Sequence, residues 1–249
     1  MIDGVPVDAP FDFSPDDIES VQVLKDASAA IYGAAGAKGV VLITTKSGKG
    51  KPSLTFNATT SVSTTAQRYD LASPQEFMYG IKKTLDEAGF DFSGVGSNDK
   101  GYNTDWQDQV FQTAISNSYN LAWGFSNSKS SLKLNGSYDN QEGIVKNTGL
   151  KRLTGRANLG QKLLNDKLKL EANVTMSRTE NSYAPLSNNA GYQGSLLGAA
   201  LQFNPTYPIY NANGSFYQPG DQRNPSQMLA YFDDNDRVNR FLTSISGSY

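Results

Sequence analysis

Six segments of this 249-residue chain alternate between apolar and polar residues, and this period of two constrains the fold more than any other feature. Successive side chains of a β-strand point to opposite faces, so each segment predicts a strand with one apolar and one polar face. The segments run approximately through residues 54–62, 119–126, 132–139, 152–159, 168–177 and 240–249. Their lengths are those of tilted strands that cross a bilayer.

The connections between the segments are short at one end of the predicted sheet and longer at the other. Residues 126–129 and 164–166 predict tight hairpins, whereas residues 64–115, 141–151 and 181–237 form intermediate or long connections. This asymmetry is typical of outer-membrane β-barrels, whose short turns are periplasmic and whose long loops lie outside. A soluble β-sandwich also has alternating strands and is the alternative. The two differ in whether the apolar face packs against a second sheet or faces outward as a band. That face carries Leu121, Trp123, Leu132, Leu134, Leu168 and Leu170.

The long connections are predicted to contain short helices. Residues 73–87 begin with an N-cap serine, a proline at the first helical position and the glutamate of a capping box, and Gly89 follows them. Residues 104–111 predict a second short helix, with its large side chains on a shared side.

The first 46 residues follow a different pattern, which predicts a strand, a short helix, a tight turn and a second strand. Residues 18–24 begin a β-branched run, an aspartate can cap a helix over residues 27–32, and Gly36 and Gly39 frame a turn. Residues 40–45 are almost wholly apolar, so we expect that strand to be covered on both faces. A Gly, Lys and Pro stretch then predicts a flexible hinge.

The composition excludes several classes of function. Lys and Arg total 22 against 24 Asp and Glu, so no basic excess exists with which to bind nucleic acid. The chain has no Cys and no His, which removes disulfides, the usual thiolate and imidazole metal ligands, and His-dependent nucleophiles. No run of 18 or more apolar residues predicts a transmembrane helix. We find no catalytic constellation and expect a protein that is not an enzyme.

Two clusters of functional residue types have ordinary interpretations. Gly33, Gly36 and Gly39 do not form a dinucleotide-binding fingerprint, because a predicted helix precedes them and a strand follows. Residues 233–236, Asp-Asp-Asn-Asp, could offer oxygen ligands to Ca²⁺ but lack the spacing and glycine of an EF-hand loop. A solvated turn is the favoured interpretation of this second cluster.

Many aromatic residues lie in the predicted loops beside Asn and Gln. Flat rings next to amides suit stacking on sugar faces, and they also suit peptides. The alternative is that these rings pack the loops or form an interfacial girdle. The candidate substrate-binding residues are Tyr102, Trp106, Tyr192, Tyr210 and Tyr217.

Two parts of the chain resemble the SusC/RagA family of TonB-dependent outer-membrane transporters. Residues 3–6 (DGVP), 17–20 (DIES), 23–33 (VLKDASAAIYG) and 39–46 (GVVLITTK) resemble the end of the family's plug domain. Residues 104–108 (TDWQD), 118–121 (SYNL) and 138–145 (YDNQEGIV) resemble the start of its barrel. The resemblance is weakest over residues 182–235.

The resemblance implies a mainly β fold. We expect an antiparallel transmembrane β-barrel, of which about six strands are present, preceded by a small α/β remnant of the plug. Residues 1–49 would form the C-terminal part of the plug domain, and residues 50–249 the first strands and extracellular loops of the barrel. Arg152 and Arg156, on the face away from lipid, are then expected to pair with plug carboxylates.

The resemblance also implies a function in transport. Such a receptor imports a glycan or peptide nutrient across the cell outer membrane of a Gram-negative, Bacteroidetes-like bacterium. A SusD-like surface lipoprotein delivers the nutrient, the TonB–ExbB–ExbD complex drives displacement of the plug, and no cofactor takes part. The chain begins without a secretory signal and shows no TonB box, no early plug and few of the roughly 22 strands of a plugged barrel. We therefore expect a fragment that does not transport alone. The alternative is a β-rich glycan-binding or surface interaction module without transport activity.

Overall fold

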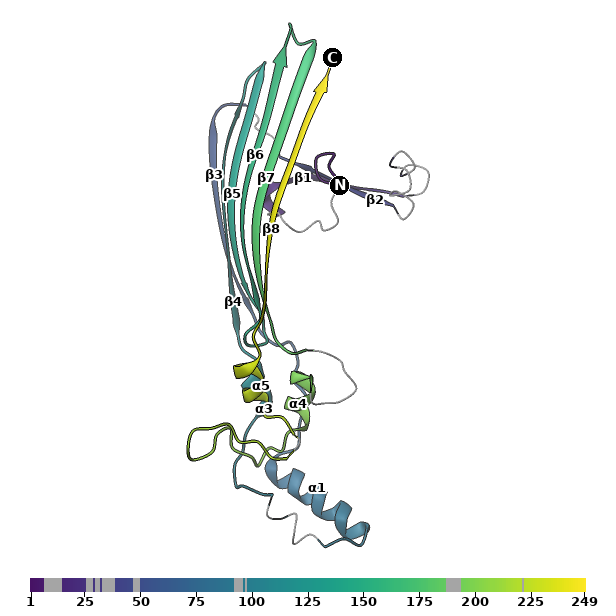
Figure 1. Cartoon of the computed structure of the whole chain (residues 1–249), viewed down its shortest axis with the longest axis vertical. Coiled ribbons are helices and arrows are strands. Elements are labelled where there is room, and N and C mark those ends of the chain that lie inside the picture. Colours follow the sequence, from purple (N-terminus) through teal and green to yellow (C-terminus); the bar gives the residue numbers. More distant parts are fainter. Residues whose placement is uncertain are drawn as a thin grey trace.

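A six-stranded antiparallel sheet forms most of the structure, and a two-stranded sheet lies beside its upper half (Figure 1). The computed structural model describes residues 1–6, 15–25, 29, 32, 39–46, 50–91, 96, 98–186, 194–220 and 222–249. We call the six-stranded sheet the wall. Its strands are β3 (Ser53–Ser63), β4 (Ala114–Ser126), β5 (Ser130–Glu142), β6 (Gly149–Leu163), β7 (Leu168–Tyr183) and β8 (Asp234–Ser248).

The wall is a meander in which each strand pairs antiparallel with the next one along the chain. The register places like faces together, because Leu121 lies opposite both Phe56 and Gly136, and Tyr119 lies opposite Tyr138. The alternation within each strand therefore becomes two continuous surfaces, one apolar and one polar. All six predicted strands are confirmed, most of them with longer bounds than the sequence indicated.

Tight turns join β4 to β5 and β6 to β7 at one end of the wall, as predicted. In the first turn, the Asn127 side chain accepts hydrogen bonds from the backbone N–H groups of Lys129 (2.8 Å) and Ser130 (2.7 Å). In the second turn, three successive residues from Leu164 to Asp166 have left-handed φ angles of 53°, 56° and 68°. Asn and Asp tolerate this conformation better than most residues do, which explains their place in the turn.

The longer connections gather at the opposite end of the wall, where they form a compact group of loops and helices (Figure 1). We call residues 64–113, 143–148 and 184–233 the loop layer. Its helices are α1 (Pro74–Glu87), α3 (Trp106–Val110), α4 (Leu196–Gln202) and α5 (Pro225–Tyr231). The predicted capping box of α1 is present, with Ser73 and Glu76 bonded reciprocally. Among the described residues, no helix is long and apolar enough to cross a membrane.

The loop layer has its own apolar core. The Trp106 ring packs edge-on against Phe203 at a centroid distance of 4.7 Å, and Phe203 packs edge-on against Tyr207 at 5.7 Å. The core draws residues from all three connections. Its buried members are Trp106, Val110, Val145, Ala184, Leu196, Ala200, Phe203, Tyr207 and Leu229. The three connections are thus held together by burial of apolar surface.

In the N-terminal part of the chain, a 3₁₀ turn (Pro15–Asp17) leads into β1 (Ile18–Leu24), which pairs antiparallel with β2 (Val40–Thr45). Residues 1–3 lie along the other edge of β2, where Ile43 N donates to Met1 O (2.9 Å) and Asp3 N donates to Ile43 O (3.0 Å). Gly39 has a φ of 91°, and a Cβ there would lie 3.0 Å from Leu24 O, so the position requires glycine. Of the predicted helix over 27–32, only residues 29 and 32 are among the described residues, and the predicted turn residue Gly36 lies outside them.

The described residues of this chain do not cover both faces of β2. Val40, Ile43 and Thr45 are buried, but Val41 between them is 45% exposed. The strand belongs to a small antiparallel sheet, and such sheets can leave one face open. An apolar sequence alone cannot distinguish this case from a fully buried strand.

Candidate functional site

The face of the wall that looks toward β1 and β2 is polar, and its side chains are buried over the central strands β4 to β7. Its buried side chains are Asn120, Lys133, Asn135, Ser137, Asp139, Arg152, Thr154, Arg156, Ser177 and Thr179. They alternate in sequence with the apolar residues of the other face. A buried surface of this kind must be matched by hydrogen bonds and ion pairs, because unpaired polar groups are costly away from water.

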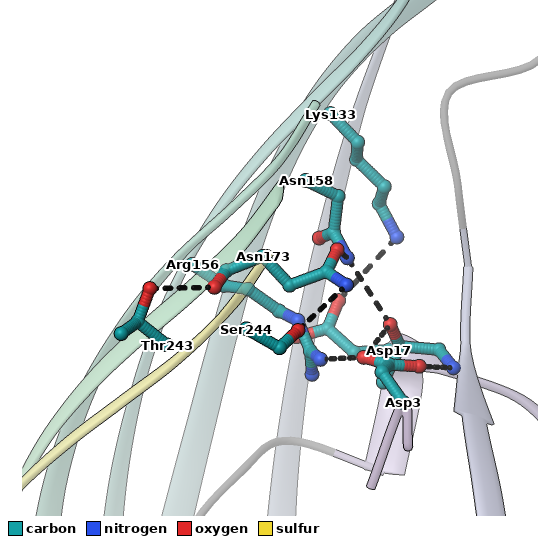
Figure 2. A network of polar contacts seen from close by, with 9 residues as sticks. Asp3, Asp17, Lys133, Arg156, Asn158, Asn173, Thr243 and Ser244 are labelled. Carbon is teal, nitrogen blue, oxygen red and sulfur yellow. Dashed lines mark hydrogen bonds and ion pairs between the residues drawn. The ribbon is translucent and has the colours of Figure 1, made fainter. Parts of the chain in front are cut away.

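The closest contact between the wall and the N-terminal part joins Asp3 to Arg156 (Figure 2). One guanidinium nitrogen of Arg156 donates to Asp3 Oδ2, and the two side chains are 3% and 12% exposed. Thr45 of β2 holds the same carboxylate, through its backbone N–H (2.9 Å to Oδ1) and its hydroxyl (2.8 Å to Oδ2). Asp3 therefore connects its own small sheet to the wall.

A second ion pair and a chain of amide side chains extend this contact along the wall. Lys133 Nζ lies 3.6 Å from Asp17 Oδ1, and the Asp17 side chain is 2% exposed. Asn158 Nδ2 donates to Thr45 Oγ1 (3.4 Å) and to Asn173 Oδ1 (2.8 Å), and Asn173 Nδ2 donates to Ser244 Oγ (3.3 Å). Figure 2 shows these side chains converging from β5, β6, β7 and β8 on the two aspartates.

The structure supports one of the two predicted arginine contacts with the plug. Arg156 pairs with Asp3 as expected for a plug carboxylate. Arg152 instead donates to a carboxylate of the wall, Asp139, with its Nε at 3.2 Å and its Nη2 at 3.0 Å from Oδ2. Asp139 lies directly opposite Arg152 in the β5–β6 register, so this pair forms within the wall. The sequence did not indicate which carboxylate would pair with Arg156, since 153 positions separate it from Asp3.

The contact is not fully satisfied within the described part of the chain. Nε and NH1 of Arg156 and Oδ1 of Asn135 are buried and have no hydrogen-bond partner there. Asn135 lies opposite Arg156 in the register of β5 and β6. Buried polar atoms without direct partners are the usual places for ordered water.

The other face of the wall exposes its apolar side chains. Leu121 is 50% exposed, Trp123 37%, Leu134 43% and Leu170 39%, while Leu132 and Leu168 are half-buried. No second sheet covers these residues in the part of the chain that the structure describes. The apolar positions of β4 run from Ile115 to Phe125, which is about 33 Å along the strand and about 25 Å along the axis of a barrel with a typical strand tilt. This outward band identifies the wall as a section of a β-barrel, and the β-sandwich is excluded.

Cavities open in and beside the loop layer, and two of them are lined by described residues. The first, of about 590 Å³, lies between residues 69–73 and the helices α3 and α4. Gln107 closes its base by exchanging two hydrogen bonds with the Tyr69 backbone (3.0 and 2.8 Å). The second, of about 470 Å³, is lined mainly by polar groups, including Glu142, Asn147 and Asp233.

The predicted substrate residues do not form one cluster. Trp106 is 2% exposed and its Nε1 donates to Asn204 O (3.0 Å), so its ring is a part of the loop core. Tyr102 and Tyr210 are each 53% exposed and belong to different parts of the loop layer. Tyr217 is half-buried, with its ring 5.0 Å from that of Tyr207. Tyr192 lies outside the described residues.

The structure instead assembles three rings around Phe216, of which Tyr210 and Tyr231 are exposed. Tyr210 lies 5.0 Å from Phe216, and Phe216 lies 5.6 Å from Tyr231, which is 74% exposed. We call Tyr210, Phe216 and Tyr231 the aromatic platform. Sequence inspection could place all three in loops but could not bring Tyr231 to Phe216, because α5 determines that contact.

The acidic stretch at residues 233–236 is largely accounted for by pairing at the start of β8. Asp236 accepts hydrogen bonds from Asn181 Nδ2 (2.6 Å) and from the Tyr183 hydroxyl (2.9 Å). Among the described residues, no three acidic side chains are grouped as metal ligands would be.

Comparison with known proteins gives the family. The profile of the TonB-dependent Receptor Plug Domain matches residues 1–40. The TonB-dependent receptor SusC of Bacteroides thetaiotaomicron is 33% identical over 95% of this chain and 25% of its own length. The TonB-dependent receptor P3 of Formosa agariphila is 34% identical over 82% of this chain and 20% of its own length. The chain belongs to the SusC/RagA family of TonB-dependent receptors.

Solved structures of the SusC/RagA family share the fold. The RagAB peptide transporter superposes with a TM-score of 0.74 at 25% identity, over 88% of this chain and 28% of that chain. The chain thus spans about a quarter of the length of the SusC relative and of the RagAB chain. The matched relatives are named as receptors or transporters.

Proposed function

We propose that this chain forms the end of the plug and the first six barrel strands of an outer-membrane importer. Residues 1–49 would belong to the plug and residues 50–249 to the barrel. One observation carries the proposal. The wall reverses the usual arrangement of a soluble protein, because its apolar side chains face outward and its buried side chains are polar. Such a wall is stable when lipid lies on one side and a wet, plugged lumen on the other.

The polar contact between plug and wall suits a plug that must move. Asp3–Arg156 and Asp17–Lys133 place two carboxylates of the plug against two cations of the wall. Buried ion pairs gain little net free energy over separated, hydrated ions, because desolvation offsets much of the attraction. A pulling force from the TonB–ExbB–ExbD complex would therefore replace these contacts with water rather than expose a large apolar core.

The nutrient is proposed to be a glycan or a peptide that reaches the loop layer from a SusD-like surface lipoprotein. The aromatic platform offers exposed rings, and the loop between Tyr210 and Phe216 carries Asn211 and Asn213. Rings with neighbouring amides bind both sugars and peptides. One solved relative is named a peptide transporter, which supports the peptide as one of the two classes.

Uptake by the full-length receptor in cells tests this proposal. Labelled oligosaccharides and peptides are supplied to a strain whose only copy of the receptor carries Tyr210→Ala with Tyr231→Ala. We expect reduced uptake of one class, with normal receptor abundance in the outer membrane. Tyr79→Ala is the control, because Tyr79 is 68% exposed on α1 and lies outside the platform. Recovery of the native receptor in the soluble fraction would contradict the transport proposal.

A surface-attached glycan-binding module without transport activity is the second candidate. The aromatic platform favours it as much as it favours transport, but the outward apolar band does not. Retained glycan binding with no uptake in the wild-type strain would support this second function.

A further inference from the structure

A cluster of three cations and one carboxylate lies on the outward face of the wall, at the end near the loop layer. Glu180 of β7 is flanked by Lys151 on β6 and by Arg237 on β8, which occupy the positions directly opposite it. Arg178 lies two residues earlier on the same strand and on the same face. We call these four residues the cationic cluster.

The charges of the cationic cluster do not balance. Arg178 donates from Nε (3.0 Å) and NH2 (2.7 Å) to Oε1 of Glu180, and Arg237 donates from Nε (2.9 Å) to the same oxygen. The side chain of Arg178 is 50% exposed, that of Glu180 39% and that of Arg237 59%. With Lys151 included, three positive charges face one negative charge.

The cationic cluster borders the apolar band directly. Leu153 follows Lys151 by two residues on β6, Met176 precedes Arg178 by two on β7, and Phe241 lies opposite Met176 on β8. These three side chains are 60%, 56% and 63% exposed. The outward surface therefore changes from apolar to cationic over two residues along a strand. An anionic lipid has the matching arrangement, because its charged head group adjoins its apolar chains.

We propose that the cationic cluster binds the phosphate head group of an anionic lipid in the outer leaflet, whose acyl chains lie on Leu153, Met176 and Phe241. The proposal rests on the membrane placement proposed above, in which the loop-layer end of the wall faces outward. Arg guanidinium groups bind phosphate bidentately, and a phosphate would supply the negative charge that the cluster lacks. A free anion would not contact the adjacent apolar surface, so we favour a lipid as the ligand.

Glu180 neutralises part of the positive charge of this site. Its carboxylate accepts hydrogen bonds from both guanidinium groups, which lowers the net charge available to a phosphate. Replacing Glu180 with Gln is therefore expected to strengthen phosphate-lipid binding, whereas a purely structural salt bridge would give no gain in binding.

Native mass spectrometry of the full-length receptor in nanodiscs tests the proposal, with lipid A carrying two phosphates and its dephosphorylated form as probes. Each cation near an anionic lipid contributes roughly 1 kcal/mol, which is about fivefold in affinity. Lys151→Gln, Arg178→Gln and Arg237→Gln combined are expected to weaken binding of the phosphorylated lipid about 100-fold. The matched control removes three cations of the loop layer, Arg68, Lys82 and Lys83, and should leave binding unchanged.

Unchanged binding in the triple variant would overturn the proposal, and so would equal binding of phosphorylated and dephosphorylated lipid. Displacement of the lipid by inorganic phosphate at similar concentration would indicate a free-anion site and would also overturn it. Stronger binding in Glu180→Gln would support it. Heat-modifiable migration of each variant on gels reports barrel folding separately, so a failure of membrane insertion is distinguishable from a failure of lipid binding.

Discussion

The loop layer and the wall follow opposite packing rules, although the same chain passes back and forth between them. The loop layer has a core of large apolar side chains inside it, where Trp106 is 2% exposed. In the wall, Arg156 is 6% exposed while Leu121, on the other face of the sheet, is 50% exposed. The difference fits the membrane placement proposed above, with water around the loop layer and lipid outside the wall.

The comparison explains why a hydropathy argument fails for this protein. An apolar residue marks the interior of the loop layer and the exterior of the wall, so burial cannot be read from residue type. The two tryptophans of the chain represent the two rules, because Trp106 lies in the loop core and Trp123 in the outward band. Substitutions that are matched between the regions can therefore test whether the rules differ.

The largest effect is expected from Trp106→Ala. The change removes a ring that packs on Phe203 and a hydrogen bond to Asn204 O, which together should cost about 3–5 kcal/mol of loop-layer stability. Limited proteolysis of the full-length receptor should show earlier cleavage of residues 64–113. Trp123→Ala in the wall should leave that cleavage pattern unchanged. Equal sensitivity of the two variants to the protease would contradict the view that the loop layer and the wall follow different packing rules.

Arg156→Ala is expected to follow, with a cost of about 3 kcal/mol to docking of the plug, because Asp3 would be left buried without its cation. Hydrogen exchange of residues 40–46 should report the loss as faster exchange in β2. Asp3→Ala added to Arg156→Ala should cost less than the sum of the two single changes, since both remove the same pair. Arg68→Ala, which breaks an exposed pair with Asp108, is the control and should leave β2 unaffected. Additive costs would show that the pair does not hold the plug.

A pair of neighbouring arginine substitutions tests the two faces of the wall. Phe241 faces outward and is 63% exposed, while Leu242 next to it faces the polar side. Phe241→Arg should destabilise the receptor in lipid by about 2–4 kcal/mol if it lies near the bilayer midplane. Leu242→Arg should cost less, because its side chain meets the polar surface. Urea unfolding in vesicles of phosphatidylcholine measures both, and a reversed order would invert the assignment of the faces.

Much of the wall could be predicted from the sequence, since a period of two and tight turns around Asn127 and Asn165 are local properties. The exposure of Leu121 could not be assigned from the pattern alone, because the pattern is the same in a sandwich and in a barrel. Val41 shows the same limit in the plug, where an apolar strand turned out to have an open face. Whether an apolar face is exposed depends on which elements pack against it, and the residues of the strand itself do not determine this.

The contacts of the candidate site were less accessible to prediction. Asp3 and Arg156 meet only because the N-terminal segment lies along β2 and β2 lies against the wall. Trp106 was predicted as a substrate residue and lies in the loop core, since residues of α4 and the following loop cover it. The composition of a loop does not distinguish aromatic residues that pack from aromatic residues that bind a ligand. Only the three-dimensional neighbours separate the two roles.

Helix α1 is the part of the loop layer that obeys neither rule. None of its residues is buried, so its stability depends on local interactions rather than on the loop core. Its capping box is one of these, with Ser73 Oγ accepting from Glu76 N (3.3 Å) and the Glu76 carboxylate accepting from Ser73 N (2.9 Å). Ser73→Ala should therefore destabilise the helix by about 1 kcal/mol and leave the loop core unchanged.

The same capping box predicts the smallest effect, which depends on pH. The hydrogen bonds from Ser73 lower the pKa of Glu76 below its ordinary value of 4.5 in the folded helix. A carboxyl group with a depressed folded pKa stabilises the helix fully above its unfolded pKa, and the contribution is lost as the pH falls through the folded value. Exchange of the α1 amides should therefore quicken below about pH 4.5, relative to the amides of the loop core. Glu76→Gln keeps a capping side chain without a titrating group, so its α1 exchange should lack this pH dependence. If the variant retained the full dependence, Glu76 would not be its source, and α1 would have to be stabilised by the rest of the loop layer after all.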